Sequence, residues 1–213
     1  NQLNGAERLL FNKQRDIYIQ HPDREPELFD SENYNKTYKI TINVGEQFEH
    51  YEFSDYNDKK GFISIFNKET FEAIIIELDT IKDFVEYLDE REKLLLSGKT
   101  ITVKCKEKDL LAEYLMNARK FTIDYSAPHI KEIILNLEGA WEKYHKSESV
   151  KLKHEADRIS YFIDHMVKND ILALPNGEVL ARELMNLGRT ERRSLAVTVM
   201  SLVSKYENTP GIL

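Results

Sequence analysis

Apolar and polar residues alternate along the segment from Thr37 to Val44. A period of two is typical of a strand buried on one face, so we expect a half-buried strand here. The aromatic-rich segment 48–53 is expected to pair with it, and segment 62–66 to form a third strand after the polar loop 55–61. Together these segments predict a small antiparallel meander covered on one face.

Helical periodicity replaces this alternation after Asn67, which is a favourable N-cap residue. Thr80 and Asp83 have the spacing of a capping box. The segment from Asn67 to Gly98 is therefore expected to be either one long helix or two helices with a break near Asp79. Ile101–Cys105 is expected to be a fourth strand, and residues 108–116 are expected to form a further helix. The middle of the chain therefore mixes helices with a strand.

After Pro128 the apolar spacing is helical throughout. Helices are expected at residues 130–144, 150–167, 179–187 and 190–206. Strands followed by a run of helices are typical of an α+β protein. We predict an α+β fold, in which a small antiparallel sheet packed with helices is followed by a C-terminal helical bundle. A boundary near 122–129 would give a mixed part, 1–125, and a helical part, 126–213, with a single domain as the alternative.

The composition excludes several classes of protein. The 213 residues carry a formal net charge of −7, so nucleic acid or anionic lipid could bind only through a local basic patch. The single Cys105 excludes an intrachain disulfide framework, and no Cys/His spacing suggests a zinc site, so neither a metal nor a cofactor is predicted. Cys105 should be buried and inert, and one cysteine fits a reducing compartment, which favours the cytoplasm.

No apolar run is long enough to cross a bilayer, and the polar start does not resemble a signal peptide. We therefore expect no membrane association. The chain begins with Asn1 instead of Met, and its last residues, 209–213, suggest an entry into more structure. The sequence is expected to be a fragment of a longer chain.

Arg189, Arg192 and Arg193 lie where the last predicted helix begins, with Thr190 as its expected N-cap. A helix N-terminus carries about half a positive charge, so cations there are mildly unfavourable. We expect this charge to be offset by Glu191, by a carboxylate from elsewhere in the fold, or by an anionic partner.

Asp157, Tyr161 and Asp164 share one face of the predicted helix 150–167. This row could be a solvated face with surface ion pairs, or it could bind arginines within the chain or between subunits. The arginines available for such a network are Arg182, Arg189, Arg192 and Arg193. The third alternative is that the arginines bind phosphate or nucleic acid. The ion-pair network is our first expectation, and these seven residues are the predicted binding residues.

Sequence motifs do not identify a catalytic residue. Gly98–Thr100 resembles the end of a phosphate-binding loop, but it precedes a strand instead of a helix. His154 and Glu155 begin like a zinc-protease motif, but Arg158 stands where its second histidine would be. The lysines after the strand 101–105 lack the acid that a metal-dependent nuclease needs beside them. Whether the protein is an enzyme is left open.

Three blocks of sequence resemble a family of bacterial hypothetical proteins. They are residues 77–88, residues 107–115, and residues 157–162 taken together with the helix that contains Arg192 and Arg193. The resemblance implies a bacterial origin and brings no assigned activity.

We expect a protein-binding or assembly module that works through a protein partner or self-association. Such a module needs an exposed apolar patch or a partner chain. The alternative is a nuclease-related, defence-type enzyme that processes nucleic acid, with its active site incomplete or outside this chain. It needs carboxylates clustered beside a lysine, and the candidates are Glu77, Asp79, Asp83, Glu107 and Asp109. A small regulatory ligand site between the sheet and the helices is a third alternative.

Overall fold

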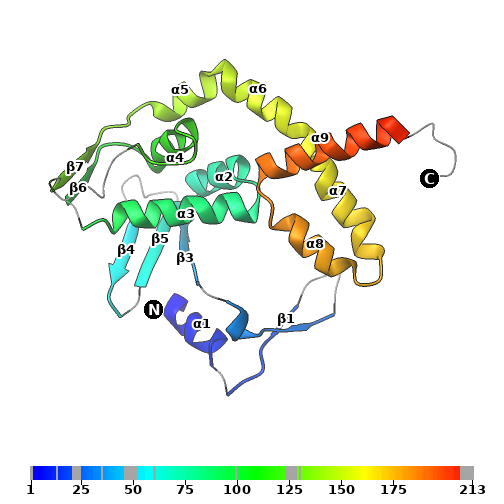
Figure 1. Cartoon of the computed structure of the whole chain (residues 1–213). Coiled ribbons are helices and arrows are strands. Elements are labelled where there is room, and N and C mark those ends of the chain that lie inside the picture. Colours follow the sequence, from blue (N-terminus) through cyan, green and yellow to red (C-terminus); the bar gives the residue numbers. More distant parts are fainter. Residues whose placement is uncertain are drawn as a thin grey trace. The chain divides into compact units, whose positions relative to one another are not determined.

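The computed structural model describes residues 2–12, 14–20, 25–34, 36–45, 52–59, 61–98, 100–122, 129 and 131–206. It is a mixed α+β structure with small sheets and a helical C-terminal region, as predicted (Figure 1). Contacts within the chain divide it into two compact units, residues 1–66 and 67–213. The predicted boundary between residues 125 and 126 falls among residues outside the described ranges and stays a prediction.

In its described residues, the first unit contains one α-helix and most of the strands. Its elements are α1 (Gln2–Leu10), β1 (Tyr18–Ile19), β2 (Glu27–Leu28), a short 3-10 turn (Ser31–Asn33), β3 (Lys39–Asn43), β4 (Ser54–Asn57) and β5 (Gly61–Asn67), whose last residue lies across the boundary. The strand order is β3-β5-β4, and β5 runs antiparallel to β4. The predicted strands at 37–44 and 62–66 are thus present.

The predicted meander is wrong in its order, because β5 and not its predecessor lies next to β3. The predicted partner strand 48–53 falls mostly on residues outside the described ranges. β4 instead occupies Ser54–Asn57, within the segment predicted to be a polar loop. Its side chains are mostly exposed, and an exposed strand lacks the apolar alternation that identifies a strand in a sequence.

The second unit begins with helices α2 (Lys68–Glu77) and α3 (Ile81–Leu95). The Asn67 side chain accepts a 2.8 Å hydrogen bond from the Thr70 amide, and the Thr80 hydroxyl accepts one of 3.1 Å from the Asp83 amide. The two caps confirm the N-termini that the sequence predicted, and they show that the long segment is two helices.

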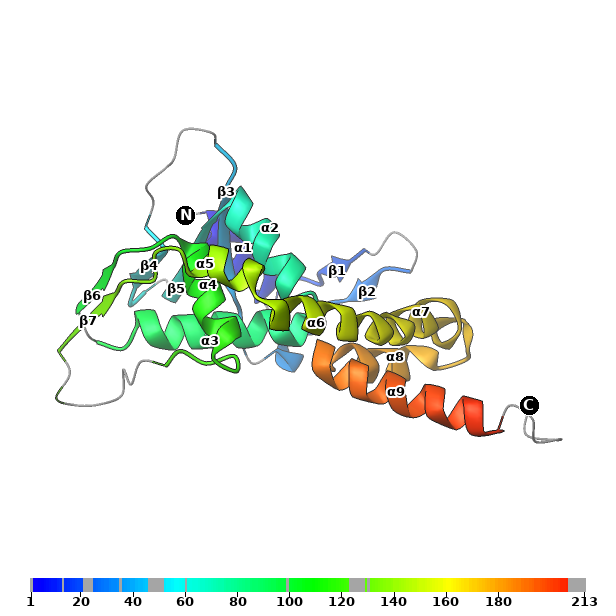
Figure 2. The same cartoon turned by 90° about the horizontal axis from the view of Figure 1, so that it is seen from above.

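The rest of the second unit is mostly helical. Its elements are β6 (Thr100–Val103), α4 (Glu107–Met116), β7 (Glu132–Leu135), α5 (Ala140–Lys146), α6 (Glu148–Asp157), the 3-10 turn η2 (Arg158–Ser160), α7 (Tyr161–Asn169), the 3-10 turn η3 (Ile171–Ala173), α8 (Gly177–Met185) and α9 (Arg189–Tyr206). Figure 2 shows α9 running beside α7 and α8, with its last turns extending past them. The predicted strand at 101–105 and helices at 108–116, 179–187 and 190–206 are each present to within a few residues.

The helix predicted at residues 130–144 is wrong. Its first half is the strand β7, whose exposed and buried residues alternate, and its second half is α5. The run Ile133-Ile134-Leu135 suits either structure, because a short apolar run has no period that distinguishes them. Parallel pairing with β6, which is distant in sequence, decides for the strand.

The helix predicted at 150–167 is interrupted. α6 ends at Asp157, η2 follows, and α7 begins at Tyr161. The Ser160 hydroxyl donates to the backbone carbonyl of Asp157. Such bonding of a serine back to the preceding turn bends helices, and it accounts for the break.

Two clusters of buried apolar residues can be described in the core of the second unit. One contains Ile163, Val167, Ile171, Ala181 and Ala196, and it joins α7, α8 and α9. The other contains Ala112, Ala140, Tyr144 and Val150, and it joins α4, α5 and α6. The segment from α6 to α7 links the two clusters, and this is where the predicted row of polar residues lies.

Candidate functional site

Helix α9 begins at Arg189, and two carboxylates lie at its N-terminus. The Gly188 amide donates a 2.8 Å hydrogen bond to Glu191 Oε2, and the Arg189 amide donates one of 2.9 Å to Asp83 Oδ2. The residue before the helix is therefore Gly188. The sequence had suggested Thr190 as the N-cap, and that prediction is wrong. The positive charge at this helix N-terminus is therefore offset in both of the ways expected within the chain. Glu191 provides a local carboxylate, and Asp83 provides one from α3.

The side chain of Arg189 is buried among acidic and polar groups. Its Nε lies 2.9 Å from Asp79 Oδ1, and its Nη1 lies 2.8 Å from Asp164 Oδ2 and 3.1 Å from Ser160 Oγ. The guanidinium also stacks on the Tyr161 ring, 4.3 Å from its centroid. Burial by itself would lower the pKa of Arg189, but the two carboxylates outweigh it and raise this pKa above its ordinary value.

Tyr161 also bonds to Asp79. Its hydroxyl donates a 2.8 Å hydrogen bond to Asp79 Oδ2, and this bond, together with burial, raises the pKa of the phenol. Asp79 therefore bridges Tyr161 and Arg189 with its two oxygens. It lies in the short link between α2 and α3, so the bridge ties that link to α7 and α9.

Arg192 fixes the end of α8 to the same network. Its Nη1 lies 2.5 Å from Asp164 Oδ1, while Nε and Nη2 donate to the backbone carbonyls of Leu187 and Met185 at 3.0 and 2.8 Å. Only 4% of Arg192 is exposed. All three nitrogens donate within the chain, so this arginine joins α7, α8 and α9.

Arg193 and Arg182 have different surroundings. Arg193 Nη1 lies 3.0 Å from Asp157 Oδ1, and Lys153 Nζ binds the other oxygen of Asp157 at 2.9 Å. Arg182 Nη2 pairs with Glu178 on the exposed side of α8 at 3.1 Å. Its place in the network stays a prediction. The one-turn spacing of residues 178 and 182 explains this pair.

Asp83 extends the network toward α4. Its other carboxylate oxygen forms an ion pair with Arg119, which follows the end of α4. Burial alone would raise the pKa of Asp83, but Arg119 and the Arg189 amide together hold it below its usual value. Arg119 and its neighbour Ala118 both have positive φ angles, 62° and 55°. Non-glycine residues rarely adopt this conformation, so the ion pair holds a strained backbone in place.

The other acidic residues that the nuclease alternative requires are also paired. Glu77 is buried, and its Oε2 accepts from the Tyr144 hydroxyl at 2.6 Å and lies 3.0 Å from His154 Nε2. Burial, followed by the bond to Glu77, raises the pKa of Tyr144. Glu107 accepts two hydrogen bonds from the fully buried Arg91, one from Nε at 2.7 Å and one from Nη2 at 3.0 Å.

The two oxygens of Asp109 accept from the backbone amides of Lys106 and Trp141, both at 3.0 Å. The five candidate carboxylates are therefore neither scattered on the surface nor gathered around one point. Among the described residues, no three His, Cys, Asp or Glu side chains are placed to hold a metal ion. Cys105 is half-buried, and burial raises the pKa of its thiol to about 12.

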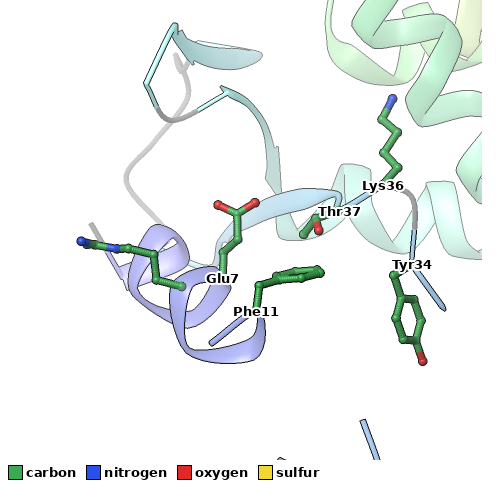
Figure 3. Close-up of a pocket in the computed structure, with 6 residues that line it drawn as sticks. Glu7, Phe11, Tyr34, Lys36 and Thr37 are labelled. Carbon is green, nitrogen blue, oxygen red and sulfur yellow. The ribbon is translucent and has the colours of Figure 1, made fainter. Parts of the chain in front are cut away.

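The first unit contains a hollow of about 460 Å³ beside α1 (Figure 3). Its lining residues are Glu7, Arg8, Phe11, Tyr34, Lys36 and Thr37. Figure 3 shows the Lys36 ammonium and the Tyr34 hydroxyl pointing in opposite directions, while Phe11 lies to the side of both. The lining polar groups do not converge on one point, so this hollow offers no defined ligand position.

The arginine network is therefore the most organised polar site in the described part of the chain. The sequence indicated six of its members, Asp157, Tyr161, Asp164, Arg189, Arg192 and Arg193, but not Asp79, Asp83, Arg119 or Ser160. Asp79 and Asp83 were named in the sequence only as candidate carboxylates of a nuclease site, because nothing local indicates which cations they meet. Whether any of these residues binds a partner stays a prediction.

No protein-family model, no curated protein and no solved structure matches this sequence. None of the described helices is both long and apolar enough to span a bilayer.

Proposed function

We propose that the protein is a binding module that assembles with a helical protein partner through the distal half of α9. The observation that carries this proposal is an uncovered apolar surface, which we call the distal α9 face. It consists of Met200, Leu202, Val203 and Tyr206, whose exposed fractions range from 38% to 53%. Leu202 and Tyr206 also belong to the apolar stripe that follows the arginines in the sequence, Leu195, Val199, Leu202 and Tyr206.

The composition of the segment supports an apolar partner. No charged side chain occurs from Ser194 to Ser204, although 31% of the whole chain is charged. A charged partner surface would lose its hydration here without meeting an opposite charge. An amphipathic helix that places its own apolar stripe against this face would bury both surfaces from water.

The anchoring of α9 also supports this use. Its first turn is held by Asp83, Asp164 and Glu191, and Ala196 is fully buried in the core. A rigid helix loses little conformational entropy when a partner docks, so more of the burial energy appears as affinity. The acidic network is accordingly assigned the role of positioning this face. A bacterial origin and a cytoplasmic location, which the resemblance and the single cysteine favour, belong to the same proposal.

Site-specific photocrosslinking in the native host tests the proposal. A photoreactive phenylalanine analogue at Val203 should give one discrete crosslinked product, because this position lies on the distal α9 face. The same analogue at Glu155, an exposed position on α6, is the matched control and should give none. Met200→Glu, in the chain carrying the probe at Val203, should abolish the product by placing a charge in the apolar contact.

The folded state of Met200→Glu is checked by the fluorescence of Trp141, the single tryptophan, which lies in the second unit. Absence of a discrete product at Val203, or its persistence in the folded Met200→Glu chain, contradicts the proposal.

A further inference from the structure

Strands β6 and β7 form a two-stranded parallel sheet, seen side by side in Figure 1. Thr100 lies opposite Glu132 and Val103 opposite Leu135. The Thr100 amide donates to the Lys131 carbonyl at 3.0 Å, and the Lys104 amide donates to the Leu135 carbonyl at 2.7 Å. These bonds fix which backbone groups point into the ladder and which point out of it.

In a parallel ladder, the residue opposite a bonded one directs its own amide and carbonyl away from the partner strand. On β7 these outward residues are Glu132 and Ile134, and on β6 they include Ile101. No third strand pairs with either edge within the described ranges. Parallel strands normally occur in larger sheets, so this pair has edges that can be extended.

The side chains of β7 distinguish its two faces. Ile133 and Leu135 are buried, whereas Ile134 is 60% exposed and Glu132 is also exposed. An exposed β-branched residue with outward backbone groups is a favourable site for the addition of a strand. This edge lies far in sequence from the distal α9 face and does not depend on it.

We propose that the β7 edge pairs antiparallel with the β7 edge of a second copy, giving a four-stranded sheet in the order β6-β7-β7-β6. The twofold axis passes beside Ile134, so this residue lies opposite its own counterpart. Ile133 then lies opposite Leu135, and Glu132 lies opposite Asn136, at both symmetry-related positions. All apolar residues of β7 therefore meet apolar residues, which favours a second copy as the occupant.

The charge of Glu132 favours this register over the registers centred on nearby residues. Pairing centred on Glu132 would bring two carboxylates directly opposite each other, which is unfavourable. Centring on Ile133 instead would place the outward backbone groups of Glu132 opposite those of Ile134 and leave each glutamate against an isoleucine. Centring on Ile134 alone gives Glu132 an amide side chain, Asn136, that can donate a hydrogen bond.

The test is the molar mass of the full 213-residue chain, measured by light scattering over a dilution series. We expect a dimer for the wild type and a monomer for Ile134→Pro, which removes only an outward amide. Ile101→Pro makes the same change on the opposite edge of the sheet and should remain dimeric. Ile134→Lys keeps the backbone intact and should also be monomeric, because it places two ammonium groups opposite each other.

Hydrogen exchange gives a second readout. The amides of Glu132 and Ile134 should exchange slowly in the dimer and quickly after dilution to the monomer. Trp141 fluorescence shows which variants are folded, and if Ile134→Pro unfolds then Ile134→Lys decides. A monomeric wild type, a dimer that survives Ile134→Lys, or a folded Ile101→Pro monomer would overturn the proposal. A dimer that requires Met200 and not Ile134 would also overturn it, while leaving the proposal for α9 standing.

Discussion

The carboxylate of Asp83 accepts a 2.9 Å hydrogen bond from the backbone amide of Arg189, 106 positions further along the chain. The sequence identifies Asp83 as part of the local cap of α3, and the Thr80 hydroxyl does bind its amide. The carboxylate, however, is used at the N-terminus of α9 and against Arg119. One residue thus connects α3, α9 and the strained turn after α4.

Asp83→Asn should lower the free energy of unfolding of the second unit by about 2–4 kcal/mol, because it removes a buried charge that two donors share. Urea unfolding followed by Trp141 fluorescence measures the change. Glu155→Gln neutralises an exposed acid on α6 and should change the free energy by less than about 0.5 kcal/mol. Equal effects of the two substitutions would contradict the role assigned to Asp83.

The contribution of Asp83 should depend on pH in a defined direction. Its folded-state pKa is below the ordinary value of 3.8, so the unfolded chain binds its proton first as the pH falls. The stabilisation is complete above the unfolded pKa and is lost as the pH falls through the folded pKa. The difference in unfolding free energy between the wild type and Asp83→Asn should therefore be constant near neutrality and shrink below about pH 4. A difference that grows on acidification would refute this.

Gly188→Ala should also destabilise the second unit. A Cβ atom at this position would lie 2.5 Å from Asp83 Oδ1, so the carboxylate or the start of α9 has to move. We expect a loss of about 1–3 kcal/mol in urea unfolding. In the double variant with Asp83→Ala the clash is absent. Its loss in unfolding free energy should therefore be smaller than the sum of the losses in the two single variants. Strict additivity would show that the contact does not restrict residue 188.

Arg192 and Arg193 are adjacent in sequence and should differ in their effect on stability. Arg192→Met leaves two backbone carbonyls and one oxygen of Asp164 without their donor, with an expected loss of about 2–3 kcal/mol. Arg193→Met should lose less than about 1 kcal/mol, because Asp157 retains Lys153 and Arg193 is partly exposed. Thermal unfolding of both variants compares them. If Arg193→Met were the more damaging, the proposed order of importance would be reversed.

The difference in burial between Arg192 and Arg193 also decides which variant can test nucleic acid binding. Arg189 and Arg192 are each only 4% exposed, and their guanidinium groups are bound by carboxylates. A charge reversal at Arg192 would disrupt the fold before it reported on a phosphate. Arg193→Glu is the usable variant, and loss of salt-sensitive binding in a folded Arg193→Glu chain would favour the nucleic acid alternative.

The features that could be predicted from the sequence depend on contacts between residues only a few positions apart. Asn67 and Thr80 cap α2 and α3 through amides three positions later, so both helix starts were visible in the sequence. The alternation before Val44 and the helical stripe of α9 are also local patterns, because side-chain direction repeats with backbone geometry. These features gave the α+β class and most of the helices.

Contacts between distant segments decided the rest. β7 is a strand and not a helix because its backbone pairs with that of β6. The central place of β5, between β3 and β4, likewise depends on pairing between separate segments. Asp79, Asp83 and Arg119 met their partners only when α3, α4 and α9 packed together. Charge and apolar pattern tell that a side chain needs a partner, but the choice of partner depends on positions in space that short-range backbone preferences do not specify. For the same reason the apolar stripe of α9 was visible in the sequence, while only the tertiary structure decided that its distal half lies uncovered.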